Sequence, residues 1–323
     1  MPAEFDLIRR WFTRSADAGS GIVALGVGDD AALLAPAPGM QLVTSVDTLV
    51  EGVHFPADTP AAAVGWKSLA ANLSDLAAMG AAPRACLLAL TLPRIDERWL
   101  DGFAAGFFRA ADAYGCVLAG GDTTATPAGP AVITVTVFGE LPAGTALLRS
   151  GARTGDLVCV SGTPGLAALG LARWQSGNRD LHDAAIDALL YPQPRLALGS
   201  ALRGIASACI DVSDGLLGDL AHVLAASGVP GAEIDLTALP RAAALAALDD
   251  ETACDHVLAG GDDYELCFTV AAERWPEVQA AAGGRTPVTV IGRTTAAPGI
   301  RCVDRQGGVR VPTRMAWEHF RGH

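Results

Sequence analysis

Basic residues are scarce in this 323-residue chain, and Lys67 is its only lysine. The 23 Lys and Arg residues stand against 35 Asp and Glu residues, which gives a formal net charge of −12. Binding to a nucleic-acid backbone depends on clustered basic side chains that release counterions. The composition therefore argues against a nucleic-acid partner.

The sequence also lacks paired cysteines, long apolar runs and a basic leader. The shortest gap among its seven cysteines separates Cys254 from Cys267, so the CxxC spacing of zinc and redox sites is absent. An odd, unpaired set is typical of reduced thiols in a protein core. No apolar run approaches the ~18 residues of a membrane helix, and Glu4 and Asp6 are unlike a signal peptide. We expect a cytoplasmic protein with no membrane partner.

Two common nucleotide-binding motifs are missing as well. Lys67 lies in a Gly-Trp-Lys-Ser context at 65–68, without the GK[ST] of a phosphate-binding loop. The segment 26–28 lacks the later glycine of a dinucleotide-binding fingerprint. An anionic nucleotide could bind to this acidic protein only if metal ions neutralised its phosphate charge, as lysines do in other nucleotide-binding proteins.

Length and periodicity predict two α/β domains. A single core rarely grows beyond ~250–300 residues, and apolar β-branched segments alternate here with alanine-rich helical ones. The polar, glycine-bearing segment 149–156 is the best boundary, so we expect domains at 1–148 and 149–323. Helices are expected at about 3–18, 61–79, 96–114, 164–177, 183–190, 195–204, 214–227 and 272–282, and strands at about 22–26, 31–35, 41–46, 84–92, 131–139, 156–161, 207–212, 232–236, 264–270 and 287–292.

Aspartates recur where these apolar segments are expected to end. Asp47, Asp122 and Asp211 each follow an apolar run, and Asp214 comes three residues after Asp211. Carboxylates at strand ends converge on one rim of a sheet, where α/β proteins usually bind ligands. Each Asp could instead form a turn or cap a helix, and Asp214 suits a helix N-cap. The repetition is more than capping requires.

Helix 61–79 carries a narrow polar stripe. Ser68, Asn72 and Asp75 are spaced i, i+4 and i+7, which places them on one face of an otherwise apolar helix. A buried Asp75 needs a partner, because an unpaired buried charge is costly. That partner could be a backbone N–H, Lys67, or a divalent cation shared with the other aspartates. A ligand set of oxygens without His or Cys favours Mg²⁺, which proteins use with phosphate groups.

Seven segments of the chain resemble the bacterial thiamine-monophosphate kinase family, in the family's order and over residues from about 4 to 320. They occur at 28–32, 44–55, 72–80, 120–124, 149–152, 211–216 and 260–266.

The resemblance implies an enzyme that transfers the γ-phosphoryl group of ATP to thiamine monophosphate by direct, in-line, Mg²⁺-assisted transfer. The product would be thiamine diphosphate, in the last step of its biosynthesis. The family is similar to aminoimidazole ribonucleotide synthetase. The resemblance therefore also implies a homodimer whose N-terminal sheets form a shared barrel, an N-terminal ATP- and Mg²⁺-binding domain, and a C-terminal α/β sandwich.

The resemblance further assigns roles to individual residues, with Asp47 and Asp122 expected to be catalytic. The Mg²⁺ ligands implied are Asp30, Thr44, Ser45, Asp47, Asp75, Asp122, Asp211 and Asp214; the ATP contacts are Gly121, Asp122, Arg149 and Ser213; and the thiamine monophosphate contacts are His54, Asp262 and Trp317. The family usually has Glu at the position of Asp262, so the carboxylate here is one methylene shorter.

Other interpretations follow from the residues alone. His54 could be a polar turn residue, Arg149 a linker arginine, and Trp317 a packing residue instead of a platform for the thiazolium or pyrimidine ring. A regulatory protein that binds ATP and Mg²⁺ without turnover is the alternative function, as is a superfamily relative with another acceptor. Selenophosphate synthetase is disfavoured because the first cysteine is Cys86, and hydrogenase-maturation relatives because the chain ends in His323.

Overall fold

A computed structural model describes residues 4–14, 21–27, 31–126, 128–310 and 315–316. The chain forms two compact units. The first consists of residues 1–76 and 81–144, and the second of residues 77–80 and 145–323. Each unit combines helices with β-sheet, which confirms the α/β class expected from the alternation of segments.

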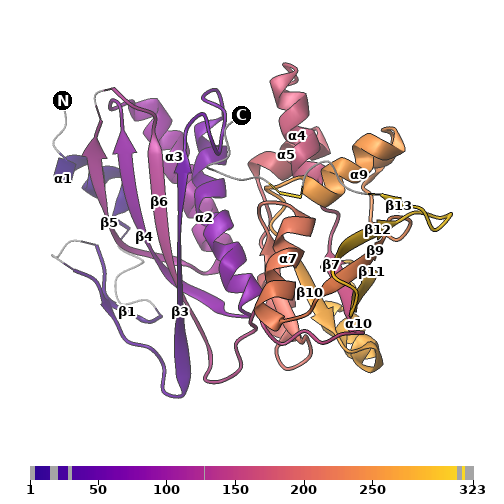
Figure 1. Ribbon diagram of the computed structural model, residues 1–323. Coiled ribbons are helices and arrows are strands. Elements are labelled where there is room, and N and C mark those ends of the chain that lie inside the picture. Colours follow the sequence, from indigo (N-terminus) through magenta and orange to yellow (C-terminus); the bar gives the residue numbers. More distant parts are fainter. Residues whose placement is uncertain (1–3, 15–20, 28–30, 127, 311–314, 317–323) are drawn as a thin grey trace. The chain divides into compact units, whose positions relative to one another are not determined.

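The first unit is built around a four-stranded sheet with two long helices on one face (Figure 1). Its main elements are α1 (Glu4–Leu7), the π-helix η1 (Ile8–Phe12), β3 (Met40–Val50), α2 (Ala61–Ala78), β4 (Ala82–Leu92), α3 (Glu97–Tyr114), β5 (Val117–Ala125) and β6 (Val132–Pro142). The strand order is β3-β6-β4-β5, with β4 and β5 parallel and the other pairs antiparallel. Helix α3 connects the parallel pair, as a crossover connection requires.

Local sequence sets the ends of α3. The carboxylate of Asp96 accepts hydrogen bonds from the backbone N–H groups of Arg98 and Trp99, at 3.0 and 3.2 Å. These bonds satisfy donors that the first turn of a helix leaves unpaired. The helix ends at Gly115, whose φ of 64° lies in the left-handed region that glycine tolerates.

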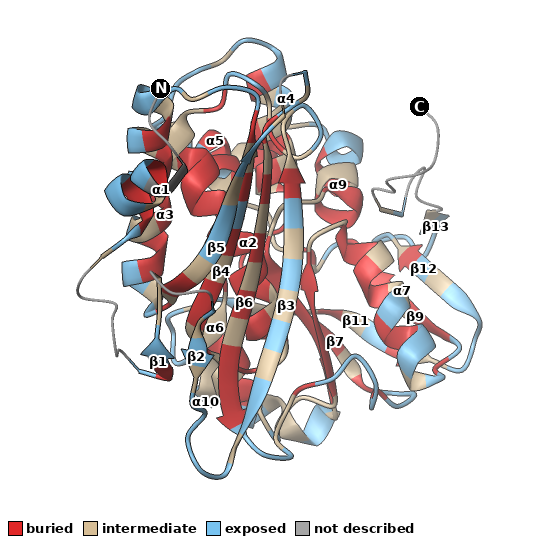
Figure 2. Cartoon of the chain, turned by 90° about the vertical axis from the view of Figure 1, so that its left-hand side faces the viewer, coloured by how far each residue is buried: buried red, intermediate tan, exposed pale blue. Residues whose placement is uncertain are grey.

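The two faces of the four-stranded sheet differ in exposure. Ile133, Val135 and Val137 of β6 are fully buried on the face that α2 and α3 cover. Leu42 and Val46 of β3 alternate with the residues that pair with Val135 and Val137, so they lie on the opposite face, and they are 40% and 57% exposed. Exposed and less exposed residues alternate along β3 in Figure 2. We call this opposite face, which carries Val46 and its cross-strand partner residues, the open face.

A small two-stranded sheet covers part of the open face. It pairs β1 (Val23–Leu25) with β2 (Leu33–Leu34) in antiparallel fashion. Val23 is 1% exposed and packs in one cluster with Ala85 and Ala119, which come from β4 and β5. The loop between β1 and β2 carries the predicted metal ligand Asp30, which lies outside the described residues.

The second unit contains a seven-stranded sheet in the order β13-β12-β9-β11-β7-β10-β8. The elements are β7 (Leu157–Ser161), α4 (Leu166–Gln175), α5 (Ala184–Leu190), α6 (Leu196–Leu202), β8 (Ala208–Val212), α7 (Leu216–Ser227), β9 (Gly231–Asp235), α8 (Ala243–Ala246), α9 (Asp250–Ala259), β10 (Glu265–Val270), the 3₁₀-helix η3 (Ala272–Arg274), α10 (Trp275–Ala282), β11 (Val288–Thr295), β12 (Gly299–Val303) and β13 (Val309–Arg310).

Helices pack on both faces of this sheet. Successive residues of β7 point to opposite faces, because side chains alternate along a strand. Val158 and Val160 belong to a cluster that includes residues of α7 and α9. Cys159 between them belongs to a second cluster, with residues of α6 and α10. Each face of the sheet therefore packs against its own hydrophobic core. Because both faces are buried, most of the strands have apolar residues at successive positions.

The pairing of the cysteines and the apolar character of the helices can be compared with the expectations from the sequence. All seven cysteines are free and buried, which confirms them as reduced core thiols. Burial raises the pKa of Cys159 to about 12, so this thiol is a poor nucleophile. Of the helices in the described ranges, none has the length and apolar character needed to cross a membrane.

The structure corrects several expected boundaries. The described part of the predicted helix 3–18 consists of α1 and η1, which end at Phe12. Asp47 and Asp122 lie inside β3 and β5 instead of after an apolar segment, because these strands run further than their apolar cores. Asp211 lies inside β8, as the strand expected at about 207–212 implies. Asp214 does not cap α7, whose N-cap is Gly215. Strands β5, β12 and β13 and helices α8 and α9 were not among the expected elements.

Candidate functional site

Ser45 and Asp47 of β3 lie against the polar stripe of α2. The hydroxyl of Ser45 donates a hydrogen bond to Oδ2 of Asp75 at 2.6 Å. The backbone N–H of Asp47 donates to Oδ1 of Asn72 at 2.9 Å, and Asn72 is fully buried. The spacing that placed Asn72 and Asp75 on one helical face thus brings both to the same strand.

The donor set on this side of the sheet fits Mg²⁺. Ser45, Asp47 and Asp75 offer hydroxyl and carboxylate oxygens, which are the hard ligands that Mg²⁺ prefers. Among the residues with described positions, no three His, Cys, Asp or Glu side chains gather closely enough to hold a metal ion. The three residues are therefore part of a candidate site and not a complete coordination shell.

Asp122 is not brought to these residues within the first unit. It pairs in register with Ala89 of β4, which pairs in turn with Thr134 of β6 and Thr48 of β3. Residues in one such row share a face of the sheet. Asp47 belongs to the neighbouring row, so the two aspartates lie on opposite faces and on opposite edge strands. Thr44 is exposed on β3 and shares the open face with Asp122.

Gly121 has a structural reason to be glycine. A Cβ atom at this position would lie 1.9 Å from the backbone oxygen of Leu88 on the adjacent strand. The close pairing of β4 and β5 therefore requires the absence of a side chain here. This requirement holds whether or not Gly121 also contacts ATP.

His54 is held in one tautomer by its own turn. Its Nδ1 accepts a hydrogen bond from the backbone N–H of Val50 at 3.0 Å, so the ring proton of the neutral imidazole is on Nε2. The backbone oxygen of His54 accepts a bond from Nζ of Lys67 at 3.4 Å. Lys67 is only 4% exposed. The only lysine of the chain thus contacts the turn that carries a predicted substrate contact.

In the second unit, the end of β8 and the loop that follows it carry three predicted contact residues. Asp211 is the last-but-one residue of β8 and is 5% exposed. Ser213 and Asp214 follow, and their backbone N–H groups donate to Oδ2 of Asp219 at 3.1 and 3.3 Å. Burial, and then the nearby Asp214 carboxylate, raise the pKa of Asp219 to about 6. The loop is therefore folded around a carboxylate from the first turn of α7.

Asp262 lies in a strained turn beside that loop. Asp262 and Tyr264 have φ values of 66° and 52°, which only a few per cent of non-glycine residues adopt. The hydroxyl of Tyr264 donates to Oδ1 of Asp262 at 3.1 Å. Between them, Asp263 accepts a bond from the N–H of Gly165 at 2.7 Å. Burial raises the pKa of Asp263 well above its ordinary value.

Arg149 is exposed at the start of the segment expected to separate the domains. The Oγ atom of Ser227 accepts bonds from the N–H groups of Gly151 and Ala152, each at 3.1 Å, and donates to the oxygen of Arg149 at 3.2 Å. The Ser227 side chain therefore fixes the backbone beside Arg149, and the Arg149 residue remains exposed at the surface. The predicted contact Trp317 lies outside the described residues.

Comparison with known proteins identifies the family. Residues 28–141 match the N-terminal domain of AIR synthase related proteins, and residues 153–305 match the C-terminal domain. Thiamine-monophosphate kinase of Salmonella typhimurium is 47% identical over 91% of this chain and 90% of its own length. The Escherichia coli K12 enzyme is 44% identical over 98% of this chain and 97% of its own. The chain belongs to the thiamine-monophosphate kinase family.

Solved structures of thiamine-monophosphate kinases have the same fold. The enzyme of Stenotrophomonas maltophilia K279a superposes with a TM-score of 0.83 at 46% identity, over 90% of this chain and 93% of that one. AaThiL complexed with AMPPCP and TMP gives a TM-score of 0.77 at 32% identity, over 91% and 92% of the two chains. A hydrogenase maturation protein, HypE, in complex with ATP reaches 0.78 at 20% identity, which shows the fold alone.

Two residues of this thiamine-monophosphate kinase family member were missed by the sequence analysis. Asp219 binds the ligand-bearing loop from four residues beyond Gly215, a distance at which a helix returns to the same face. That spacing was visible in the sequence. Tyr264 contacts Asp262 in a turn where both residues have positive φ. No pattern in the neighbouring sequence predicts that backbone conformation.

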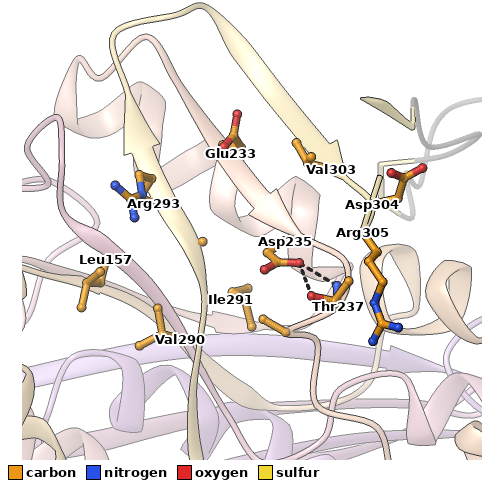
Figure 3. Close-up of a pocket in the computed structure, with 12 residues that line it drawn as sticks. Leu157, Glu233, Asp235, Thr237, Val290, Ile291, Arg293, Val303, Asp304 and Arg305 are labelled. Carbon is orange, nitrogen blue, oxygen red and sulfur yellow. Dashed lines mark hydrogen bonds between the residues drawn. The ribbon is translucent and has the colours of Figure 1, made fainter. Parts of the chain in front are cut away.

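A hollow of about 440 Å³ in the second unit lies apart from these residues (Figure 3). Its lining mixes the carboxylates of Glu233 and Asp235 with the guanidinium groups of Arg293 and Arg305. The carboxylate of Asp235 is engaged by both the N–H and the hydroxyl of Thr237. None of the predicted site residues in the described ranges lines this hollow, and we assign it no ligand.

Proposed function

We propose that this chain transfers the γ-phosphoryl group of ATP to thiamine monophosphate, which yields thiamine diphosphate and ADP. The observation that carries the proposal is the 47% identity to a thiamine-monophosphate kinase over 91% of the chain. The contact of Ser45 with Asp75 supports it locally, because it joins two of the expected metal ligands.

Mg²⁺ is the cofactor that we propose for this reaction. We propose that Ser45, Asp47 and Asp75 bind Mg²⁺ together with the phosphate oxygens in the first unit. Asp211 and Asp214 are proposed as Mg²⁺ ligands in the second unit. Mg²⁺ usually binds through a few carboxylates and substrate phosphates. When bound, it would neutralise phosphate charge that a chain with a formal net charge of −12 would otherwise repel.

The chain's own residues would mainly bind and orient the two substrates. The phosphate monoester of thiamine monophosphate has a second pKa near ~6 and is largely dianionic at neutral pH. It needs no general base to become a nucleophile. Positioning of two anions in line is then the main requirement. We assign that task to His54, Asp262 and Trp317 for the acceptor and to Gly121, Arg149 and Ser213 for ATP.

Coupled ADP release tests the function directly. Thiamine monophosphate, free thiamine and no acceptor are compared at fixed ATP and Mg²⁺. The proposal expects ADP only with the monophosphate. ADP with none of the three, from protein that still binds ATP, would instead support a binding protein without turnover or a relative with another acceptor.

Lys67 should affect the affinity for thiamine monophosphate through His54. Lys67→Met keeps the length of the side chain but removes its charged donor to the His54 oxygen. A hydrogen bond to a charged group contributes about 1.5–3 kcal/mol, so we expect KM for thiamine monophosphate to rise about tenfold at nearly unchanged kcat. Steady-state kinetics of Lys67→Met, His54→Ala and the double variant measure this. The double variant should match His54→Ala, and an unchanged KM in Lys67→Met would refute the assignment.

We also propose a homodimer in which the N-terminal sheets form a shared barrel. In the described residues, β3 pairs only with β6 along eleven residues, and its outer edge is unpaired. A long unpaired edge strand with apolar side chains is a template for pairing with another chain. Asp122, on the opposite edge strand, would then approach the other ligands from the partner copy. The first 148 residues are in this view the ATP-binding and dimerisation domain.

Val46→Glu should dissociate that dimer. Val46 is 57% exposed on β3, where a charge would be buried by pairing. Sedimentation equilibrium should give a dimer for the unmodified chain and a monomer for Val46→Glu. Val309→Glu is the control, since Val309 is 48% exposed on β13 of the second unit. A monomeric unmodified chain would contradict the shared barrel.

The proposed location is the cytoplasm. Seven free, buried thiols suit a reducing compartment. ATP, the proposed phosphoryl donor, is also available there.

A further inference from the structure

A single carboxylate oxygen of Asp219 organises the loop that carries Ser213 and Asp214. Oδ2 of Asp219 accepts the backbone N–H groups of Ser213, Asp214 and Gly215, at 3.1, 3.3 and 3.2 Å. Three successive amides that converge on one atom fix the orientation of the peptide planes between them. Asp219 itself is 3% exposed, so water cannot easily replace it.

The loop is in turn bonded to the turn that carries Asp262. The oxygen of Ser213 accepts the N–H of Asp262 at 2.8 Å, and the oxygen of Val212 accepts the N–H of Tyr264 at 2.8 Å. A Cβ atom at Gly261 would lie 2.5 Å from the Ser213 oxygen, so the two segments are in close contact. Tyr264 then holds the Asp262 carboxylate through its hydroxyl. One set of hydrogen bonds therefore connects Asp219 to Asp214, Ser213 and Asp262, which are predicted metal, ATP and acceptor contacts respectively.

We propose that Asp219 is a positioning residue of the phosphoryl-transfer site, which holds the 213–215 loop and, through it, the Asp262 turn in the conformation that binds Mg²⁺ and substrate. This inference rests on the proposed function for the roles of Asp214, Ser213 and Asp262. It adds a residue that would act through Ser213 and Asp214 and not by contacting Mg²⁺ or a substrate itself.

Helix capping alone does not account for this arrangement. A Ser or Asn at the N-cap of α7 would satisfy the first N–H groups without burying a charge. The chain has Gly215 at that position, with no side-chain cap, and a buried carboxylate one turn later. The strained φ values of Asp262 and Tyr264 also require a surrounding structure that fixes them. Both features point to a loop whose exact conformation matters.

The test compares Asp219→Ala with a matched structural control, Asp183→Ala. Asp183 is likewise a carboxylate of the second unit that accepts two backbone N–H groups, from Ala185 and Ile186, at the start of a helix. It belongs to none of the predicted contacts. Both variants should unfold at lower temperature than the unmodified chain.

The two variants should differ in metal binding. Residues that orient metal ligands typically contribute about tenfold to a hundredfold to affinity or activity. Mn²⁺ binding in the presence of ATP, followed by electron paramagnetic resonance, should weaken at least tenfold in Asp219→Ala and stay unchanged in Asp183→Ala. The Mg²⁺ concentration for half-maximal turnover should rise in parallel. Asp219→Asn, whose amide oxygen can still accept N–H bonds, should recover part of the affinity.

Two results would overturn the proposal. One is Asp219→Ala that binds Mn²⁺ and turns over as the unmodified chain does while melting earlier, because Asp219 would then be structural only. The other is an equal loss of Mn²⁺ binding in Asp183→Ala. If the unmodified chain forms no thiamine diphosphate, the proposed function fails, but the Mn²⁺ comparison still decides the role of Asp219.

Discussion

Asp47→Asn is expected to remove turnover while leaving the fold intact. The substitution takes away a negative charge from the candidate metal site and keeps the size of the side chain. Metal ions supply several kcal/mol of charge stabilisation in the transition state, so we expect kcat to fall on the order of a thousandfold. The hydrogen bond from Asp47 to Asn72 uses the backbone N–H, which Asn retains. Asp122→Asn should behave in the same way.

Circular dichroism and thermal unfolding, together with ADP release, measure both parts of this expectation. Asp112→Asn is the control, because Asp112 pairs with Arg14 on the exposed surface of α3 in the same unit. It should keep full activity. A folded Asp47→Asn protein with ordinary turnover would rule out Asp47 as a metal ligand.

Glu265→Gln is expected to cause the largest loss of stability. Both carboxylate oxygens of Glu265 accept bonds from Arg195, at 2.6 and 2.5 Å, and Ser161 donates a further bond. Glu265 is buried, with its side chain 7% exposed, and Arg195 is 28% exposed. Removal of one partner of a buried ion pair leaves a charge without compensation and costs about 3 kcal/mol.

That cost corresponds to a melting temperature lower by roughly 6–12 °C for a unit of this size. Calorimetry on Glu265→Gln measures it. The control is Glu277→Gln, which removes the same charge from a surface pair with Arg274, where both side chains are more than a third exposed. Surface pairs contribute little, so its melting temperature should hardly change. Equal shifts for the two variants would contradict the buried-pair argument.

The helix periodicity predicted one part of the site in detail. Ser68, Asn72 and Asp75 form a stripe on α2, and Asn72 and Asp75 both reach β3. This worked because the spacing of polar residues on a buried helix depends only on helical geometry. Helical spacing could not predict which residue bonds to Asp75, because its partner Ser45 is thirty residues away in the sequence.

The arrangement of the aspartates on the sheets was less predictable. An apolar run marks the core of a strand and not its end, so Asp47 and Asp122 were expected outside strands that in fact contain them. Which face each one occupies depends on register, and register depends on pairing between distant segments. The separation of Asp47 from Asp122 could therefore not be derived from either motif alone.

Backbone conformation was the least predictable feature. Asp262 and Tyr264 have positive φ values, and their N–H groups bond to the oxygens of Ser213 and Val212. Asp enters this region more often than most residues, but Tyr usually avoids it. The role of Asp219 was only partly predictable. Its spacing from Gly215 was visible in the sequence, but the convergence of three N–H groups on one of its oxygens was not. Such features follow from tertiary structure, which composition and periodicity do not encode.

The most direct test of the central claim follows the phosphoryl group itself. ATP labelled with ³²P at the γ-position is incubated with the chain, Mg²⁺ and thiamine monophosphate, and the products are separated chromatographically. The account predicts label in thiamine diphosphate in a one-to-one ratio with ADP, and none when free thiamine replaces the monophosphate. Label found only as inorganic phosphate, or retained in ATP by protein that binds the nucleotide, would contradict it.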